Sequence, residues 1–215
     1  MSTTPLTPTA TLPSKLPNPT IHITTNSPTT RQAQLHSSTQ NAWSFFSGET
    51  VGFNVVYTTS KFPVCLNADE DILAHQRLMQ AGTLGLVQPR GTVCRIVDFG
   101  PLHTPLMHRT QSLDYGVVLE GEIEMELGNG AEGGGVGGQV MLLKRGDVAV
   151  QRGTMHAWRN PSRTEWARML FVLQDCEPVV VGGESLREDL GHAGDNERLL
   201  KSKNDNSAYG GLDTR

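Results

Sequence analysis

The strongest constraint on the fold is a pattern that repeats between residues 92 and 175. Short segments rich in β-branched and other apolar residues are separated by turn-forming residues, as in "TVCRIVDF", "VMLLKRGDVAVQ" and "ARMLFVLQD". Two similar segments, "HITT" and "FNVVYTTS", lie earlier in the chain. Short strands at regular spacing are typical of a sandwich or a barrel. The sequence therefore predicts an all-β fold.

Alternation along these segments predicts which side chains face inward. In "EGEIEMELG", Ile123, Met125 and Leu127 alternate with glutamates, so we expect the apolar side chains inside and the glutamates, Glu126 included, in solvent. In "WARMLFVLQD" both faces are apolar, which indicates a strand that is buried on both sides. Arg168 interrupts this strand. A buried arginine needs a partner, either a structural carboxylate or an acidic group of a ligand.

One helix is predicted ahead of these strands. The segment "DEDILAHQRLMQAG", residues 69–82, carries acidic residues in its first turn and a glycine that can end it. Four apolar residues are spaced to form one face of this helix, namely Ile72, Leu73, Leu78 and Met79.

The chain divides into four parts. Residues 1–20 are rich in Thr and Pro, and we expect them to be disordered because they cannot bury enough apolar surface to offset their ordering entropy. Residues 21–90 form an extension of strands and a helix that packs on a barrel, and residues 91–180 form that barrel. A glycine-rich stretch at 128–138 is expected to be a surface hairpin loop, and residues 181–215 a loose polar tail.

Composition excludes several classes of partner. The net charge is -4 and no basic stretch stands out, which argues against binding to nucleic acid or to an anionic membrane surface. No apolar run approaches the roughly 20 residues of a membrane span. The three cysteines, Cys65, Cys94 and Cys176, are widely spaced and odd in number, as in a cytosolic protein with reduced thiols rather than a disulfide framework. We therefore expect a cytoplasmic protein.

The segment "MHRTQSLDYGVVLEGE" carries a histidine-based motif. His108, Thr110, Asp114 and Gly121 have the spacing of the first motif of the cupin superfamily, G-x5-H-x-H-x3,4-E-x6-G. In that motif Thr110 stands at the second histidine and Asp114 at the glutamate, while Leu102 occupies the place of the opening glycine.

A second segment, "RGDVAVQRGTMHAWRN", is similar to the second cupin motif, G-x5-P-x-G-x2-H-x3-N. Gly146, Gly153, His156 and Asn160 match it, with Gln151 near the proline position and one residue fewer before Gly153. The resemblance covers about residues 91–175 and implies a cupin-type jelly-roll barrel. The segments also resemble single-domain cupins of filamentous fungi, some of which are encoded with polyketide biosynthesis enzymes. A homodimer is implied by the same resemblance.

The resemblance implies a metal site inside the barrel. Cupins typically hold a divalent metal with three histidines and a glutamate. In this chain His108, Asp114 and His156 remain, and two histidines with one carboxylate can form a facial triad for Fe(II). Thr110 is a poor metal ligand, and His103 is a candidate fourth ligand. The implied function is a non-haem metal-dependent oxidoreductase that acts on a small oxygenated aromatic or polyketide-like metabolite.

Two metal-free alternatives stay open. A hydrogen bond between His156 and Asp114 would raise the basicity of the imidazole and suit proton transfer near neutral pH. Such a pair could serve a metal-independent lyase or isomerase, for example a dehydratase or a decarboxylase. The barrel could also bind a small molecule without turnover.

Three further residues are candidates for the substrate pocket, beside Thr110. Trp158 alternates with His156 and should share its inward face if the strand is regular. Arg95 and Arg168 sit in apolar strands, from which their side chains could reach a small-molecule substrate.

Overall fold

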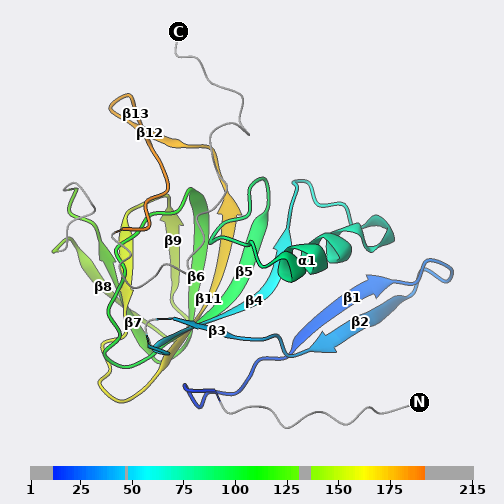
Figure 1. Ribbon diagram of the computed structural model, residues 1–215, viewed down its shortest axis with the longest axis horizontal. Helices are drawn as coiled ribbons and strands as arrows, with labels where there is room; N and C mark the ends of the chain where they lie inside the picture. The colour runs from blue at the N-terminus through cyan, green and yellow to red at the C-terminus, as the bar shows by residue number, and fades with distance from the viewer. Residues whose placement is uncertain (1–11, 47, 131–136, 192–215) are drawn as a thin grey trace.

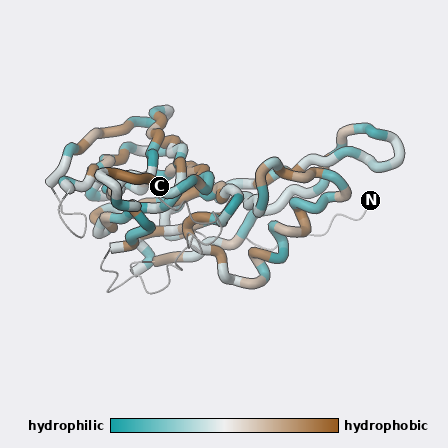
Figure 2. Tube along the Cα trace, turned by 90° about the horizontal axis from the view of Figure 1, so that it is seen from above, coloured by the Kyte–Doolittle hydropathy of each residue, from teal (hydrophilic) through white to brown (hydrophobic). Residues whose placement is uncertain are grey.

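The computed structural model describes residues 12–46, 48–130 and 137–191. Its centre is a barrel made of two antiparallel sheets, from which a hairpin and a helix project to one side (Figure 1). Seen from above, this hairpin-and-helix arm extends well beyond the barrel (Figure 2). The predicted all-β barrel with one short helix is confirmed.

The larger sheet has six strands. Their order across the sheet is β3 (Ser44–Phe46), β4 (Val51–Thr59), β5 (Thr92–Phe99), β11 (Ala167–Asp175), β6 (Ser112–Glu120) and β9 (Val148–Arg152). The strand predicted to be buried on both faces, β11, lies in the middle of the sheet and pairs with β5 and β6. One face of β11 is buried from Ala167 to Leu173, whereas on the other face Leu170 and Val172 are half-buried and Gln174 is exposed, so the prediction of burial on both sides is only partly correct.

The smaller sheet closes the barrel and places a histidine at its edge. Its three strands, in order, are β10 (His156–Arg159), β7 (Glu122–Leu127) and β8 (Val140–Lys144). Apolar side chains from both sheets, among them Val97, Val118, Ile123, Trp158 and Met169, pack into one core between them.

Two short hairpins lie outside these sheets. They are formed by β1 (Ile21–Asn26) with β2 (Ala33–Thr39), and by β12 (Val179–Val181) with β13 (Glu184–Leu186). After β13 the backbone of Asp189 pairs with that of Arg109, and Leu190 is buried in the core. The first part of the expected polar tail is therefore attached to the barrel; residues 192–215 lie outside the described residues.

The predicted helix is present as α1 (Glu70–Ala81), preceded by a short 3-10 turn (Asn67–Asp69) and ended by Gly82 at a φ of 61°. Its buried side chains are Ile72 and His75. The predicted apolar face is only partly correct, since Leu73 is 49% exposed. The helix packs against β4, where the Thr58 hydroxyl and the His75 ring are hydrogen bonded at 2.9 Å. A polar residue, His75, is therefore buried on the helix face for which the periodicity predicted apolar residues.

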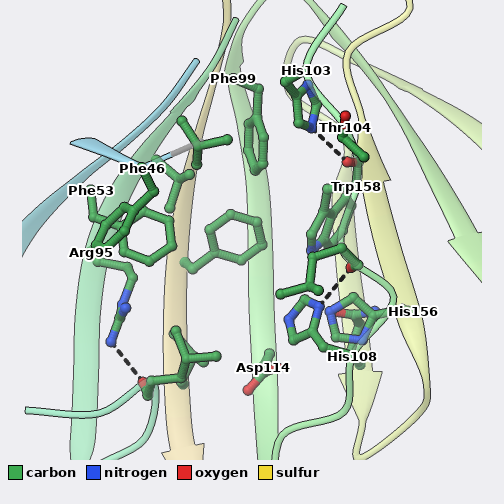
Figure 3. A pocket seen from close by; sticks show the side chains of 17 residues that line it. Phe46, Phe53, Arg95, Phe99, His103, Thr104, His108, Asp114, His156 and Trp158 are labelled. Atoms are coloured by element: carbon green, nitrogen blue, oxygen red, sulfur yellow. Dashed lines mark hydrogen bonds between the residues drawn. The ribbon is translucent and has the colours of Figure 1, made fainter. Parts of the chain in front are cut away.

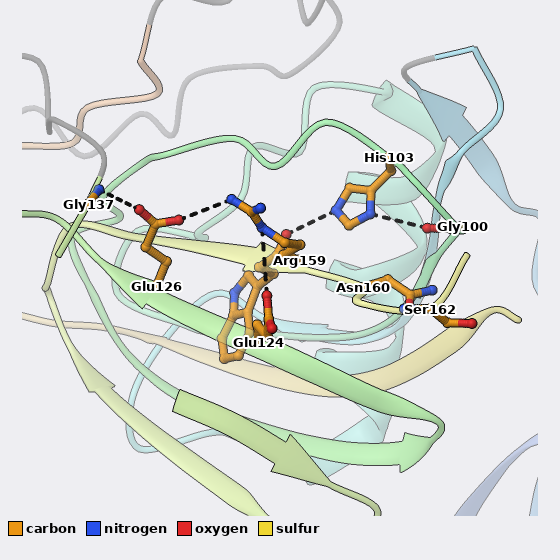
Figure 4. Close-up of polar contacts among 9 residues, drawn as sticks. Gly100, His103, Glu124, Glu126, Gly137, Arg159, Asn160 and Ser162 are labelled. Atoms are coloured by element: carbon orange, nitrogen blue, oxygen red, sulfur yellow. Dashed lines mark hydrogen bonds and ion pairs between the residues drawn. The ribbon is translucent and has the colours of Figure 1, made fainter. Parts of the chain in front are cut away.

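The glutamates of β7 do not all face solvent. Glu126 is only 6% exposed; its carboxylate accepts a hydrogen bond from the Gly137 backbone N–H (2.8 Å) and pairs with Arg159 at 3.4 Å (Figure 4). This corrects the expectation of a fully solvated outer face. Residues 131–136 of the glycine-rich loop lie outside the described residues.

The end of the segment expected to be disordered is held against the barrel. The Pro17 carbonyl accepts a hydrogen bond from Arg168, and the Asn18 side chain accepts one from the Trp43 indole. Residues 1–11 lie outside the described residues. Among the described helices, none is both long enough and apolar enough to cross a membrane.

Candidate active site

A cavity of about 110 Å³ lies inside the barrel (Figure 3). Its polar lining groups include the two motif histidines, Asp114, Gln151 and Arg95. The rest of the lining is mainly apolar or aromatic and comprises Phe46, Val51, Phe53, Leu86, Val97, Phe99, His103, Thr104, Leu106, Trp158, Phe171 and Leu173. An apolar cavity with a few convergent polar groups is the usual form of a small-molecule site.

His108 and His156 lie side by side in this cavity. The backbone N–H of each donates to the carbonyl of the other at 2.9 Å, and their ring centroids are 4.4 Å apart. His156 opens β10, and His108 lies in the segment that runs alongside it (Figure 3). The backbone pairing explains how two histidines 48 positions apart in the sequence come together.

Both imidazoles are held in a fixed orientation by backbone carbonyls. Nδ1 of His108 lies 3.0 Å from the Leu106 oxygen, and Nδ1 of His156 lies 2.9 Å from the Thr154 oxygen. Because a carbonyl only accepts, each Nδ1 carries the proton and each Nε2 keeps its lone pair. Burial lowers the pKa of both rings, and the neighbouring His108 lowers that of His156 further. The pair is therefore neutral and suited to metal ligation.

Asp114 lies on β6 in the same cavity. Its carboxylate is 3% exposed; Oδ2 accepts a hydrogen bond from the Thr110 hydroxyl at 3.2 Å, and Oδ1 has no hydrogen-bond partner among the described residues. Burial raises the pKa of Asp114 to about 6. A buried acceptor without a partner costs free energy, so Oδ1 is available for a substrate donor or a cation.

The hydrogen bond between His156 and Asp114 that the metal-free alternative invoked is not formed. Nδ1 of His156 is bonded to Thr154 instead, and no bond joins His156 to Asp114. Among the described residues no group of three or more His, Cys, Asp or Glu side chains is placed to hold a metal ion. The two histidines are thus suited as metal donors. Asp114, the third ligand of the expected triad, lines the same cavity but does not form a three-ligand group with them.

His103 does not offer a fourth metal ligand in this arrangement. Its Nδ1 lies 3.2 Å from the Gly100 oxygen and its Nε2 lies 2.9 Å from the Trp158 oxygen (Figure 4). Both ring nitrogens therefore face carbonyl oxygens, and the ring serves as a buried bridge between the 100–103 turn and β10.

The four predicted pocket residues separate into two groups. Trp158 and Arg95 line the cavity. Thr110 lies behind Asp114, where its hydroxyl also accepts a hydrogen bond from Ser112 at 2.8 Å. Arg168 lies elsewhere, because it is paired with Asp98 on the neighbouring strand. Thr110 and Arg168 are thus not among the residues that line this cavity, and both have polar partners within the barrel.

Sequence reasoning missed much of the cavity wall. Gln151 lies directly opposite Asp114 in the β6–β9 pairing, and alternation along β9 could have identified it. Phe46 and Phe53 come from β3 and β4, outside the two motifs. The motif residue Asn160 has a structural role, since its amide donates to the Phe99 and Glu165 carbonyls at 2.9 and 2.8 Å and thereby closes the turn before β11.

Comparisons with known proteins identify relatives over most of the chain. Oryzines biosynthesis cluster protein J of Aspergillus oryzae is 44% identical over 141 residues, which are 66% of this chain and 74% of that protein. Cupin-domain-containing oxidoreductase srdD of Neurospora crassa is 31% identical over 173 residues, 79% of this chain and 82% of that protein. Phomopsin biosynthesis cluster protein D of Diaporthe leptostromiformis is 45% identical over 134 residues, 62% of this chain and 66% of that protein.

No family model matches the chain. Among solved structures, a cupin-2 domain protein of Rhodospirillum rubrum is similar with a TM-score of 0.38 and 16% identity, over 68% of each chain. The sequence relatives and the antiparallel barrel with its two histidines agree: this chain belongs to the cupin family, in the group of the cupin-domain-containing oxidoreductases and biosynthesis cluster proteins of fungi.

Proposed function

We propose that this protein is a metal-dependent oxidoreductase that converts a small oxygenated aromatic or polyketide-like compound in the biosynthesis of a secondary metabolite. The relatives named as cupin-domain-containing oxidoreductases support the oxidoreductase role. The observation that carries the metal is the His108–His156 pair, whose Nδ1 protons are engaged by carbonyls so that both Nε2 lone pairs stay available in one cavity.

His108 and His156 would hold a divalent metal. Asp114 lines the same cavity and would add the carboxylate of a facial triad if its side chain reached the same ion, which it does not do in this arrangement. Asp114 supplies a buried carboxylate oxygen that lacks a partner among the described residues. When bound by two histidines and a carboxylate, Fe(II) supplies redox chemistry and open positions for substrate. The carbonyls of Leu106 and Thr154 fix the two imidazoles, as outer partners of metal-bound histidines commonly do.

The side chains that line the cavity would bind and orient the substrate. Trp158 packs edge-on against His156 with ring centroids 5.7 Å apart, and against Phe171 at 5.3 Å. These rings form an apolar wall that excludes water from the histidines and accommodates an aromatic substrate. Gln151 and Asp114, opposite each other on β9 and β6, are placed to orient the polar groups of that substrate.

Metal content tests the proposal directly. Protein purified without chelator or histidine tag should contain close to one Fe, Mn, Ni or Zn per chain by elemental analysis. His108→Ala and His156→Ala should lose it and Asp114→Asn should reduce it. His75→Gln should keep it, because His75 is also buried but contacts Thr58 outside the cavity. A parent protein that takes up no metal, even after reconstitution with Fe(II), would contradict the metal site.

A metal-independent lyase or isomerase is the second candidate, favoured by one observation. The pKa of Asp114 is raised to about 6 by burial, which suits proton transfer near neutral pH. Oxygen uptake separates the candidates: the oxidoreductase should consume oxygen and stop with chelator, whereas the lyase should work anaerobically with chelator present. A protein that binds candidate compounds but changes none under either condition would be a binding cupin.

A further inference from the structure

Arg95 lies in a wall that two cavities share. It belongs to β5 and is 5% exposed. It lines the barrel cavity and also a neighbouring cavity of about 280 Å³ between α1, β3 and β4. Three apolar side chains, Phe46, Phe53 and Leu86, line both cavities with it. In Figure 3 Arg95 and the two motif histidines lie on opposite sides of the barrel cavity.

The guanidinium of Arg95 is held in place but its charge is not paired. Nη2 donates to the carbonyls of Gly85 (2.9 Å) and Leu86 (2.7 Å), and the Phe53 ring lies 5.3 Å from Cζ. Nε is buried and has no hydrogen-bond partner among the described residues. Arg95 also forms no ion pair with any described carboxylate, although Asp114 lies close enough to favour its charge.

Arg168, the other buried arginine in an apolar strand, has a structural carboxylate as its partner. Arg168 donates from Nε and Nη2 to both carboxylate oxygens of Asp98 at 2.6 and 2.8 Å. An arginine remains charged in proteins, and a buried charge costs several kcal/mol unless it is paired. Two carbonyl contacts explain where the Arg95 guanidinium sits, but they do not compensate its charge.

The neighbouring cavity offers no compensating charge either. Among the described residues that line it, Arg95 is the one that carries a charge; the others are apolar or uncharged. The barrel cavity, at about 110 Å³, is comparable with the roughly 150 Å³ apolar cavity known to bind benzene. The space on the two sides of Arg95 thus suits an aromatic ring and an apolar substituent, with a cation between them.

We propose that Arg95 binds an acidic oxygen of the substrate, so that the substrate is a compact aromatic acid whose ring faces the two histidines. A carboxylate matches the geometry of a guanidinium and supplies the direct ion pair that Asp114, which favours the Arg95 charge from a distance, does not form. The reaction of that acid rests on the proposed oxidoreductase function, but its binding does not. This charge selection would explain why a cation is kept in an otherwise apolar wall.

Calorimetry with benzoate and its neutral isostere benzamide tests this inference, with EDTA present so that no metal can attract the carboxylate. The parent protein should bind benzoate at least tenfold more tightly than benzamide. Arg95→Met should lose at least tenfold in benzoate affinity while benzamide changes less than twofold, and Arg95→Lys should keep part of the preference. Arg152→Met removes an exposed arginine from β9 and should behave as the parent does.

Equal affinity of the parent for the two probes, no benzoate binding at several millimolar, or an unchanged preference in Arg95→Met would each overturn the inference. Circular dichroism shows whether Arg95→Met folds; if it does not, the parent and Arg95→Lys decide the outcome. The calorimetry is done with EDTA, so the preference for benzoate over benzamide should be seen even if the protein proves to bind no metal. A missing preference likewise leaves the metal content of the parent unchanged, so the two failures are distinguishable.

Discussion

Arg168 and Asp98 form a two-point ion pair between neighbouring strands, β11 and β5, in which they are direct cross-strand partners. The remaining nitrogen of the guanidinium, Nη1, donates to the Pro17 carbonyl at 2.6 Å, and the Trp43 ring lies 5.2 Å from Cζ. This single side chain therefore joins the N-terminal segment to the barrel.

Removal of Arg168 should destabilise the protein strongly. Arg168→Met leaves the fully buried Asp98 carboxylate without its counter-charge, and breaking a buried pair from one side typically costs about 3–5 kcal/mol. Urea denaturation measures this loss. The double variant Arg168→Met/Asp98→Asn should recover part of it, and benzoate binding should not change in either. A loss below about 1 kcal/mol would mean that the pair is not the anchor described above.

Thr110 should matter for stability through its hydroxyl. The hydroxyl lies between Ser112 and Asp114 and is hydrogen bonded to both. Thr110→Val should lower the free energy of unfolding by about 1–3 kcal/mol, because two buried polar groups lose a partner. Thr110→Ser keeps the hydroxyl and is the matched control, with an expected loss of less than about 1 kcal/mol. Equal stability of the Val and Ser variants would refute this role.

Acidic pH should destabilise the protein because protonation of its buried histidines is unfavourable in the folded state. His75 lies outside the barrel cavity, so a His75 variant measures this loss of stability separately from the site. Burial lowers its pKa in the folded state, so the unfolded state binds the proton first as the pH falls. The stability that neutral His75 contributes is therefore complete above its unfolded pKa of about 6.5 and is lost below it, by up to about 1.4 kcal/mol per pH unit.

The test compares urea unfolding of the parent and of His75→Gln between pH 7.5 and 5. Glutamine can keep a hydrogen bond to Thr58 but does not titrate. The parent should lose stability more steeply than the variant as the pH falls. Parallel curves would show that His75 does not bind a proton on unfolding.

Gly116 should control the size of the barrel cavity. A Cβ at this position would lie 2.9 Å from Cε1 of Phe171 and 3.3 Å from the Met169 methyl group, and Phe171 lines the cavity. Gly116→Ala should push the Phe171 ring inward and weaken benzoate binding several-fold. Gly116→Ala/Phe171→Leu restores the space and should restore affinity. Unchanged affinity in the single variant would indicate that benzoate binds elsewhere.

The arrangement of the site was partly predictable from local sequence. The resemblance to the two cupin motifs implied that His108, Asp114 and His156 share one site, and all three line the same cavity. The bounds of α1 were also predictable, since acidic residues open it and a glycine ends it. Homodimer formation and a cytoplasmic location stay predictions.

By itself, the sequence determined the short strands of the barrel, since alternation along a strand is a local period of two, and its resemblance to the cupin motifs implied which residues share the cavity. The tertiary structure decided what each buried polar group meets. Arg95 and Arg168 look alike as arginines in apolar strands, yet the register of β5 against β11 sets Arg168 opposite Asp98 and Arg95 opposite Phe171. Likewise, the strands that bring Phe46 and Phe53 to the cavity, β3 and β4, come from a part of the chain far from the two motifs. Pairing between segments far apart in sequence depends on the whole fold, because no local pattern encodes which strand lies alongside which.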